Sequence, residues 1–178
     1  TSNFRAGVNA GNSITSGGNY NTVVGDEAGT AITTGDNNVA VGYAALDLED
    51  TGTDSVAIGY NALTAQNNDA ANYNTAVGSG AGAAVTTGIQ NTLIGGIAGV
   101  ALTTGRENVA VGLAALTTED AGNYNTAIGA RALQTQNAGT DIYNTAVGYA
   151  AGLNVTTGVN NTLIGGLAGD AITTGGYN

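Results

Sequence analysis

The sequence predicts an all-β fold, a parallel β-solenoid (β-roll) of about ten coils, each 17–19 residues long. Three observations lead to this prediction: a motif that recurs at a fixed spacing, apolar residues that alternate within it, and turn-forming residues between its copies. The clearest copies span residues 38–42, 74–78 and 161–165, and read Asn, Thr or Val, Ala or Leu, Val or Ile, and Gly. Such a repeat indicates units that stack on their neighbours.

The Gly that ends each motif marks the register of the coils, and an Ala follows it three residues later in all ten copies. The intervals between these anchor glycines are 17 residues, with occasional intervals of 18 or 19. Such a period is shorter than that of the common helical repeats, which span about thirty residues or more. The anchors are Gly7, Gly25, Gly42, Gly59, Gly78, Gly95, Gly112, Gly129, Gly148 and Gly165.

Each motif predicts a short strand, because Val39 and Val41 alternate with Ala40 and therefore point to opposite faces. The Gly and Asn residues between motifs tolerate the positive φ that tight corners need. We therefore expect two or three very short strands in each coil, joined by such corners. Successive coils would stack in parallel about 4.8 Å apart, so ten coils would form a rod on the order of 48 Å long.

A large aliphatic residue alternates between two positions of the coil. Six Gly-type coils have Gly four residues after the anchor and Ile, Leu or Val seven residues after it, whereas four Leu-type coils have Leu and then Glu or Gln. We infer that both positions fill one core layer, so that the exchange keeps its volume constant. The Leu-type coils contain Leu46 with Glu49, Leu63 with Gln66, Leu116 with Glu119, and Leu133 with Gln136.

Two coils of each type form a larger unit of 70 residues, of which residues 74–143 are one full copy. We expect residues 1–178 to be a single repeat domain and a segment of a longer fibrous protein. The Asn that heads the motif is predicted to hydrogen-bond from coil to coil, as in other cross-β stacks. Thr-Thr-Gly phrases such as residues 33–35 predict ladders of Thr along one face.

Composition argues against several classes of function. The chain has no Cys, so it has no disulfide, thiolate metal site or cysteine nucleophile, and without His it lacks the commonest general base. Three basic residues against thirteen acidic ones give a net charge of −10, which argues against nucleic acid and anionic membranes as partners. No apolar run has the length of a membrane span. We expect a protein that is not an enzyme.

Acidic residues gather in two Leu-type coils and are the candidate metal ligands. Oxygen-rich clusters suit Ca²⁺, but neither cluster has the spacing of an EF-hand or of a calcium-binding β-roll. We favour the interpretation that these acids are exposed and keep a fibre soluble. No cofactor is therefore predicted, and calcium is the alternative. The candidate ligands are Asp47, Glu49, Asp50, Asp54, Glu119 and Asp120.

All eight Tyr residues lie at predicted corners, either just before the motif Asn or just after the anchor Gly. Aromatic side chains at a corner either stack on one another or stack on sugars. We favour a ladder that packs the corners. The first group contains Tyr20, Tyr73, Tyr124, Tyr143 and Tyr177, and the second contains Tyr43, Tyr60 and Tyr149.

Residues 54–59, Asp-Ser-Val-Ala-Ile-Gly, resemble the Asn-Ser-Val-Ala-Ile-Gly motif of YadA-type trimeric autotransporter adhesin heads, and residues 37–42 are close to it. Residues 74–78 and 144–149 resemble repeats of phage tail fibres and related surface fibres. The resemblance covers almost the whole chain. It implies a left-handed parallel β-roll assembled as a homotrimer, with receptor or matrix binding spread over the surface. The coil of this chain is longer than that of the adhesins.

Both faces of the motif strand are apolar, with Val, Ile or Thr on one side and Ala or Leu on the other. Since a narrow solenoid has one interior, we expect other chains to cover the second face. We expect Val77 and Ile94 to be core residues, so an Asp at either position should unfold the neighbouring coils. Glu49→Ala should be almost silent unless a metal binds there.

These features predict a structural or adhesive fibre segment, a stiff extracellular shaft or head on a cell surface or virion surface. A self-assembling extracellular filament is the alternative, and an ice- or glycan-binding solenoid is a third candidate. The expected partners are further copies of the chain, as a homotrimer or a filament, and a surface receptor or glycan. Nucleic acid and membrane insertion are not expected.

Overall fold

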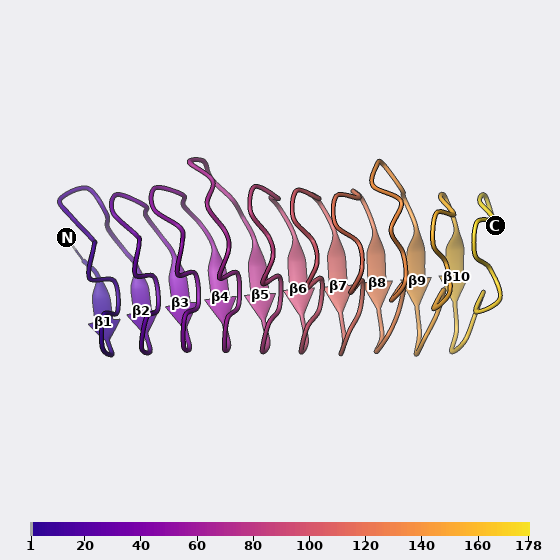
Figure 1. Ribbon diagram of the computed structural model, residues 1–178, viewed down its shortest axis with the longest axis horizontal. Coiled ribbons are helices and arrows are strands. Elements are labelled where there is room, and N and C mark those ends of the chain that lie inside the picture. Colours follow the sequence, from indigo (N-terminus) through magenta and orange to yellow (C-terminus); the bar gives the residue numbers. More distant parts are fainter. Residues whose placement is uncertain (1) are drawn as a thin grey trace.

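The computed structural model describes residues 2–178 and contains one parallel sheet of ten strands, in which each strand pairs with the next along the chain. Each coil contributes one three-residue strand, and the coils lie side by side along a rod (Figure 1). The fold is therefore the β-solenoid that the motif spacing predicts. The strands are β1 (Phe4–Ala6), β2 (Thr22–Val24), β3 (Val39–Val41), β4 (Val56–Ile58), β5 (Thr75–Val77), β6 (Thr92–Ile94), β7 (Val109–Val111), β8 (Thr126–Ile128), β9 (Thr145–Val147) and β10 (Thr162–Ile164).

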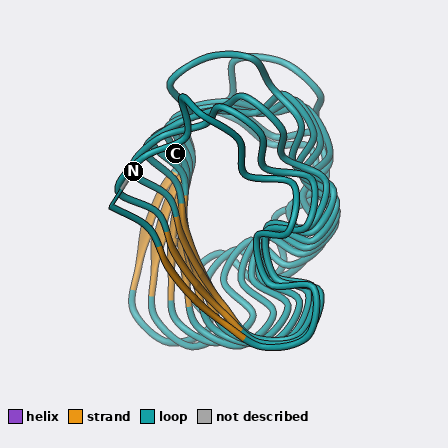
Figure 2. Ribbon diagram, turned by 90° about the vertical axis from the view of Figure 1, so that its left-hand side faces the viewer, coloured by secondary structure: helices purple, strands orange, loops and turns teal. Residues whose placement is uncertain are grey.

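Only one strand forms in each coil, where the sequence suggests two or three. The other sides of the ring consist of turns (Figure 2), in which residues such as Ala44 (φ 49°) and Leu46 (φ 53°) have positive φ. A strand cannot pass through residues in this conformation. The coils that follow β4 and β8 have the two 19-residue intervals and extend further from the rod than their neighbours (Figure 1). The described residues form no helix that is long and apolar enough to cross a membrane.

The strands stack in register, so residues at the same motif position form columns along the rod. Val41 pairs with Ile58, and Ile58 pairs with Val77. The turns follow the same order, since the Asn61 N–H donates to the Tyr43 carbonyl at 2.9 Å. Backbone hydrogen bonds therefore connect neighbouring coils at turns as well as at strands.

The anchor glycines permit adjacent coils to approach closely. Gly59 has φ of 135°, and a Cβ atom there would lie 2.5 Å from the carbonyl oxygen of Gly78. A Cβ atom at Gly42 would lie 2.5 Å from the carbonyl oxygen of Gly59. Because this obstacle is backbone and the φ is unfavourable for other residues, the position requires glycine. This requirement explains why Gly recurs in every copy of the motif.

The middle residue of each strand from β2 to β10 points into the core, and its two neighbours point outward. Ala76 and Leu93 have little or no exposed surface, whereas Val77 is half-buried and Ile94 is 38% exposed. The alternation is confirmed, but the expectation that Val77 and Ile94 are core residues is wrong. The ring is narrow, and aliphatic side chains from its turns already fill most of the interior, so the strand supplies mainly Ala.

Packing confirms that the two alternating aliphatic positions fill the same volume. A Cβ atom at Gly29 would lie 2.8 Å from Cδ1 of Ile32, and one at Gly82 would lie 3.3 Å from Cγ2 of Val85. In the Leu-type coils Leu46 and its equivalents are fully buried at the first position. A large residue at one position therefore excludes a large aliphatic residue at the other.

The motif Asn closes its own coil and joins it to the next one, as the sequence predicts. The Asn38 Nδ2 donates to the Gly52 carbonyl at 2.9 Å, 14 residues later. The Asn38 Oδ1 accepts the Ser55 N–H of the following coil at 3.0 Å. Asn91 and Asn108 continue this ladder, because the Asn108 N–H donates to the Asn91 Oδ1 at 3.0 Å.

Candidate functional site

The predicted calcium ligands are divided between the core and the surface. Glu49 and Glu119 have no exposed surface, so their interpretation as exposed, solubilising acids is wrong. Among the described residues, no group of three or more acidic side chains is placed to hold a metal ion. The remaining four candidates lie on the outside of the rod: Asp47, Asp50 and Asp54 are half-buried, and Asp120 is exposed.

Glu49 is held by neutral hydrogen-bond donors. Its Oε1 accepts the Gly52 N–H at 2.9 Å and the Asn68 N–H at 3.4 Å. Its Oε2 accepts the Gln66 Nε2 at 2.8 Å and the Asn72 Nδ2 at 3.0 Å. Three of these donors come from the following coil, so the carboxyl group links two coils from inside the ring.

Burial raises the pKa of the Glu49 carboxyl, because the ionised form loses its hydration. Hydrogen bonds from Gln66, Gly52 and Asn68 oppose this shift of the pKa, and the nearby Asp50 adds to it. A carboxyl group that is buried among neutral partners and has a raised pKa stays protonated to a higher pH than an exposed carboxyl group does. The cluster is therefore a polar contact between coils, and among the described residues it belongs to no group of three or more possible metal ligands.

Gln66 extends this contact to a third coil, since the Asn74 Nδ2 donates to its Oε1 at 2.8 Å. The same arrangement recurs 70 residues later. The Gln136 Nε2 donates to the Glu119 Oε2 at 3.2 Å, and the Asn144 Nδ2 donates to the Gln136 Oε1 at 2.8 Å. In both copies the Gln replaces a rung of the Asn ladder. The sequence signal for these buried contacts is the fixed pairing of Leu with Glu or Gln in Leu-type coils.

The Thr ladders bind the backbone of the next coil. The Thr33 Oγ1 donates to the Asp50 carbonyl at 3.1 Å, and the Thr103 Oγ1 donates to the Asp120 carbonyl at 2.8 Å. The Thr86 Oγ1 donates to the Thr103 carbonyl at 3.2 Å. These hydroxyl protons are directed along the rod, so they are not free to order water on a flat face. This geometry disfavours ice binding by the first Thr of each Thr-Thr-Gly phrase, whereas the second Thr, such as Thr34 or Thr87, is exposed.

Tyr side chains stack between neighbouring coils. The rings of Tyr43 and Tyr60 have centroids 5.5 Å apart and an interplanar angle of 13°. The ring centroids of Tyr124 and Tyr143 are 4.8 Å apart, and their interplanar angle is 4°. Each ring in these pairs covers a face of its neighbour, which leaves fewer faces for stacking on sugars. For these four residues the structure favours the packing ladder.

The outward side of the sheet, which we call the strand face, is uncharged from β2 to β10, with mainly Thr in one column and only Val and Ile in the other. The sheet forms one flank of the ring (Figure 2), and the strand face has two columns of β-branched side chains. The first column contains Thr22, Val39, Val56, Thr75, Thr92, Val109, Thr126, Thr145 and Thr162; the second contains Val24, Val41, Ile58, Val77, Ile94, Val111, Ile128, Val147 and Ile164.

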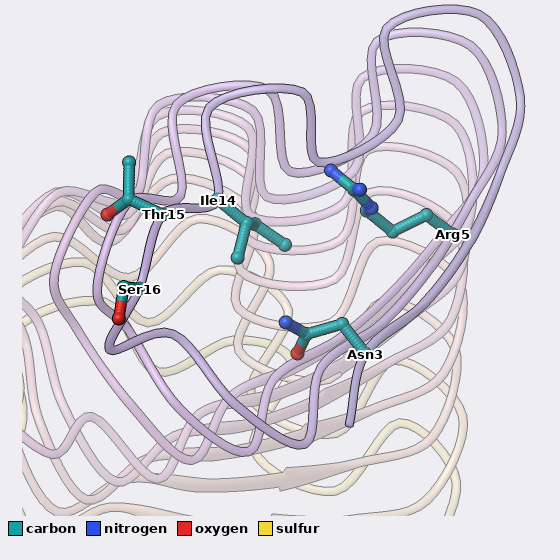
Figure 3. Close-up of a pocket in the computed structure, with 5 residues that line it drawn as sticks. All are labelled: Asn3, Arg5, Ile14, Thr15 and Ser16. Atoms are coloured by element: carbon teal, nitrogen blue, oxygen red, sulfur yellow. The ribbon is translucent and has the colours of Figure 1, made fainter. Parts of the chain in front are cut away.

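A hollow of about 330 Å³ lies in the first coil, lined by Asn3, Arg5, Ile14, Thr15 and Ser16 (Figure 3). Arg5 occupies the middle of β1, where later strands have a buried Ala, Val or Leu. Its Nη1 donates to the Gly11 carbonyl at 2.9 Å. The guanidinium group thus lies over the uncovered end of the stacked core, and the hollow is the end of that core.

Comparison of the chain with protein-family models, with curated proteins and with solved structures found no match.

Proposed function

We propose that this chain is a structural segment of a surface fibre, a stiff rod that holds a recognition element away from an extracellular surface. The observation that carries the proposal is the uninterrupted parallel ladder from β1 to β10, with hydrogen bonds between coils at strands, turns and the Asn corner. A stack whose units are joined on all sides resists bending more than a chain of separate domains does. The resemblance to adhesin heads and tail fibres supports the same function.

The side-chain contacts support a structural role over a binding role. Hydroxyl groups of the Thr ladders, amides of the Asn ladder and the two buried Glu residues all act between coils. The acidic residues that lie outside the core contribute to the net charge of −10, which favours solubility of a long rod. We propose further copies of the chain as its main partners, with a surface receptor or glycan bound elsewhere on the fibre.

A filament is the second candidate function. Among the described residues β1 and β10 each pair with one other strand, and we propose that strands of further copies pair with the remaining backbone groups of these two strands. Head-to-tail contacts of this kind do not close and therefore produce open-ended polymers.

Electron cryo-microscopy of the purified chain, combined with molar mass from light scattering, tests both candidates. Discrete particles in which rods share an axis would support the fibre segment, and three-fold symmetry would support the predicted homotrimer. Open-ended polymers would favour the filament. A monomeric chain at micromolar concentration would contradict both.

A further inference from the structure

The strand face carries no ionisable side chain on any strand from β2 to β10. The thirteen acidic residues, which together with three basic residues give the chain its net charge of −10, all lie elsewhere. The side chains on this face are half-buried or exposed, so an uncharged surface, apolar along its second column, runs along the rod. An area of about 430 Å² is typical of the largest patch on a monomer, which is often a functional surface.

The second column of the strand face alternates strictly between a smaller and a larger side chain. From β3 to β10 its residues are Val, Ile, Val, Ile, Val, Ile, Val and Ile. Ile58, Ile94 and Ile128 are 37%, 38% and 39% exposed, whereas Val77 and Val111 between them are half-buried. The column is therefore a row of Ile projections separated by Val recesses. Its period is two coils, or about 9.6 Å.

We propose that the strand face binds the strand face of a second copy of this chain, with each Ile of one copy seated over a Val of the other. A partner must present apolar projections at the same two-coil period, and a second copy does so. When each Ile lies opposite a Val, the side chains fill the space between the two faces at native packing density. If Ile lay opposite Ile, the larger side chains would keep the two faces apart and leave gaps between opposing Val residues. This inference deepens the structural function proposed above and rests on it, and it specifies a two-fold pair in place of the homotrimer that the resemblance implies.

The size of the strand face is compatible with such a pair. Nine strands spaced about 4.8 Å apart, each about 10 Å long, give about 430 Å² per copy. A pair would bury about 860 Å² from these columns alone, close to the lower limit of about 1,000 Å² for a specific interface. Exposed Tyr residues at the corners beside the strands, such as Tyr60 and Tyr73, extend the surface beyond the columns.

Two Asp substitutions in one coil test whether the strand face is the interface. Ile94→Asp places a charge on the strand face, whereas Ile97→Asp places one in the following turn, at a residue of similar exposure (38% and 42%). We expect wild type and Ile97→Asp to have the mass of an assembly by light scattering, and Ile94→Asp to have the mass of a monomer. Circular dichroism establishes that both variants keep the β signal of the wild type.

The outcomes separate this inference from the proposed function. If the wild-type chain assembles and Ile94→Asp leaves its mass unchanged, the strand-face inference is overturned and the structural function stands. A monomeric wild-type chain overturns both. Should Ile94→Asp unfold, Val77→Lys and Val111→Lys repeat the test at half-buried positions of the same column.

Single cysteines test how the two copies are aligned, because the chain has no Cys of its own. A disulfide needs Cβ atoms about 3.5–4.5 Å apart, so it reports which residues face each other. Seating of Ile over Val predicts that chains with Ile94→Cys form a disulfide with chains carrying Val77→Cys or Val111→Cys. Ile94→Cys chains alone should remain uncrosslinked under the same oxidation. Efficient crosslinking of Ile94→Cys to itself, or no crosslink in any mixture of assembled chains, would overturn the alignment.

Discussion

The Glu49 carboxyl illustrates how one residue connects coils that are distant in sequence. Gly52 lies 3 residues away in the same coil, but the other three donors lie 17 to 23 residues away and reach Glu49 because successive coils stack in register. Leu46 fills the aliphatic volume of its coil, so the side chain at position 49 lies beside polar donors of the corner. Glu49 is thus buried because the large aliphatic residue of this coil is at position 46, the same exchange of positions that keeps the core volume constant.

Removing this carboxyl should destabilise the fold, contrary to the expectation from the sequence. Glu49→Ala leaves the Gly52 N–H and the amides of Gln66 and Asn72 without their acceptor. We expect a loss of about 1–3 kcal/mol in the free energy of unfolding. The control is Asp47→Ala on the surface of the same coil, which should change it by less than about 0.5 kcal/mol. Urea denaturation measures both, and equal effects would contradict the role assigned to Glu49.

The raised pKa of Glu49 predicts the direction of a pH effect. The folded chain binds this proton more tightly than the unfolded chain, so the contribution is fully present below the ordinary pKa of 4.5. It is lost as the pH rises from that value through the pKa of the folded state. Relative to Glu49→Gln, the wild type should therefore lose unfolding free energy as the pH rises above about 4.5. Parallel pH profiles of the two chains would disprove this effect.

Anchor and loop glycines should respond differently to substitution. Gly59→Ala places a Cβ atom 2.5 Å from a backbone oxygen at φ of 135°, so we expect a loss of about 3 kcal/mol or more. Gly139→Ala meets no atom within 4 Å, and its φ of 68° carries a penalty of only about 1–2 kcal/mol. Thermal unfolding followed by circular dichroism ranks the two variants. A similar loss at both sites would show that close packing of coils does not determine the anchor.

At the scale of the coil, stability depends on matched pairs of positions. A Gly-type coil has a large residue seven positions after the anchor, and a Leu-type coil has one at four positions. Leu at the earlier position adopts positive φ, as in Leu63 (φ 49°), which is unfavourable for a residue with a side chain. Burial of the whole side chain compensates for this strain.

Converting one Gly-type coil into a Leu-type coil should show strong coupling between the two positions. Gly82→Leu alone overpacks the core, because even its Cβ atom would lie 2.7 Å from Cδ1 of Leu93 and 3.3 Å from Cγ2 of Val85. Val85→Gln alone buries an amide group beside Gly82, in a coil without the Leu that accompanies Gln in Leu-type coils. We expect the double variant to be more stable than the sum of the single effects, by about 1–3 kcal/mol. If denaturant titrations show that the losses of unfolding free energy simply add, the two positions do not share one core volume.

For the whole molecule, a chain of stacked coils should unfold in parts. Each strand contacts only its neighbours in the sheet, so stability is approximately a sum of coil and interface contributions. Residues 2–178 form no second layer of the core that would connect distant coils directly. Damage at one coil is therefore expected to spread to adjacent coils and leave remote ones folded.

Ala110→Asp in β7 should reveal this behaviour, because it places a charge at a residue with no exposed surface. We expect amide hydrogen exchange to accelerate from β6 to β8, while the protection of β2–β4 is retained. Val111→Asp, one residue later on the strand face, should leave protection in β7 close to that of the wild type. Uniform loss of protection along the rod would indicate a single cooperative unit.

The sequence by itself determined the period, the strand positions, the anchor glycines, the Asn ladder and the exchange of core volume, because each follows from local pattern and steric limits. It could not determine which side of the strand faces inward, because Ala40 and its neighbours Val39 and Val41 are all apolar. Nor could it place Glu49 and Glu119 in the core, since their donors come from other coils. Only the closed ring decided both, by setting how much volume remains inside and which polar groups line it.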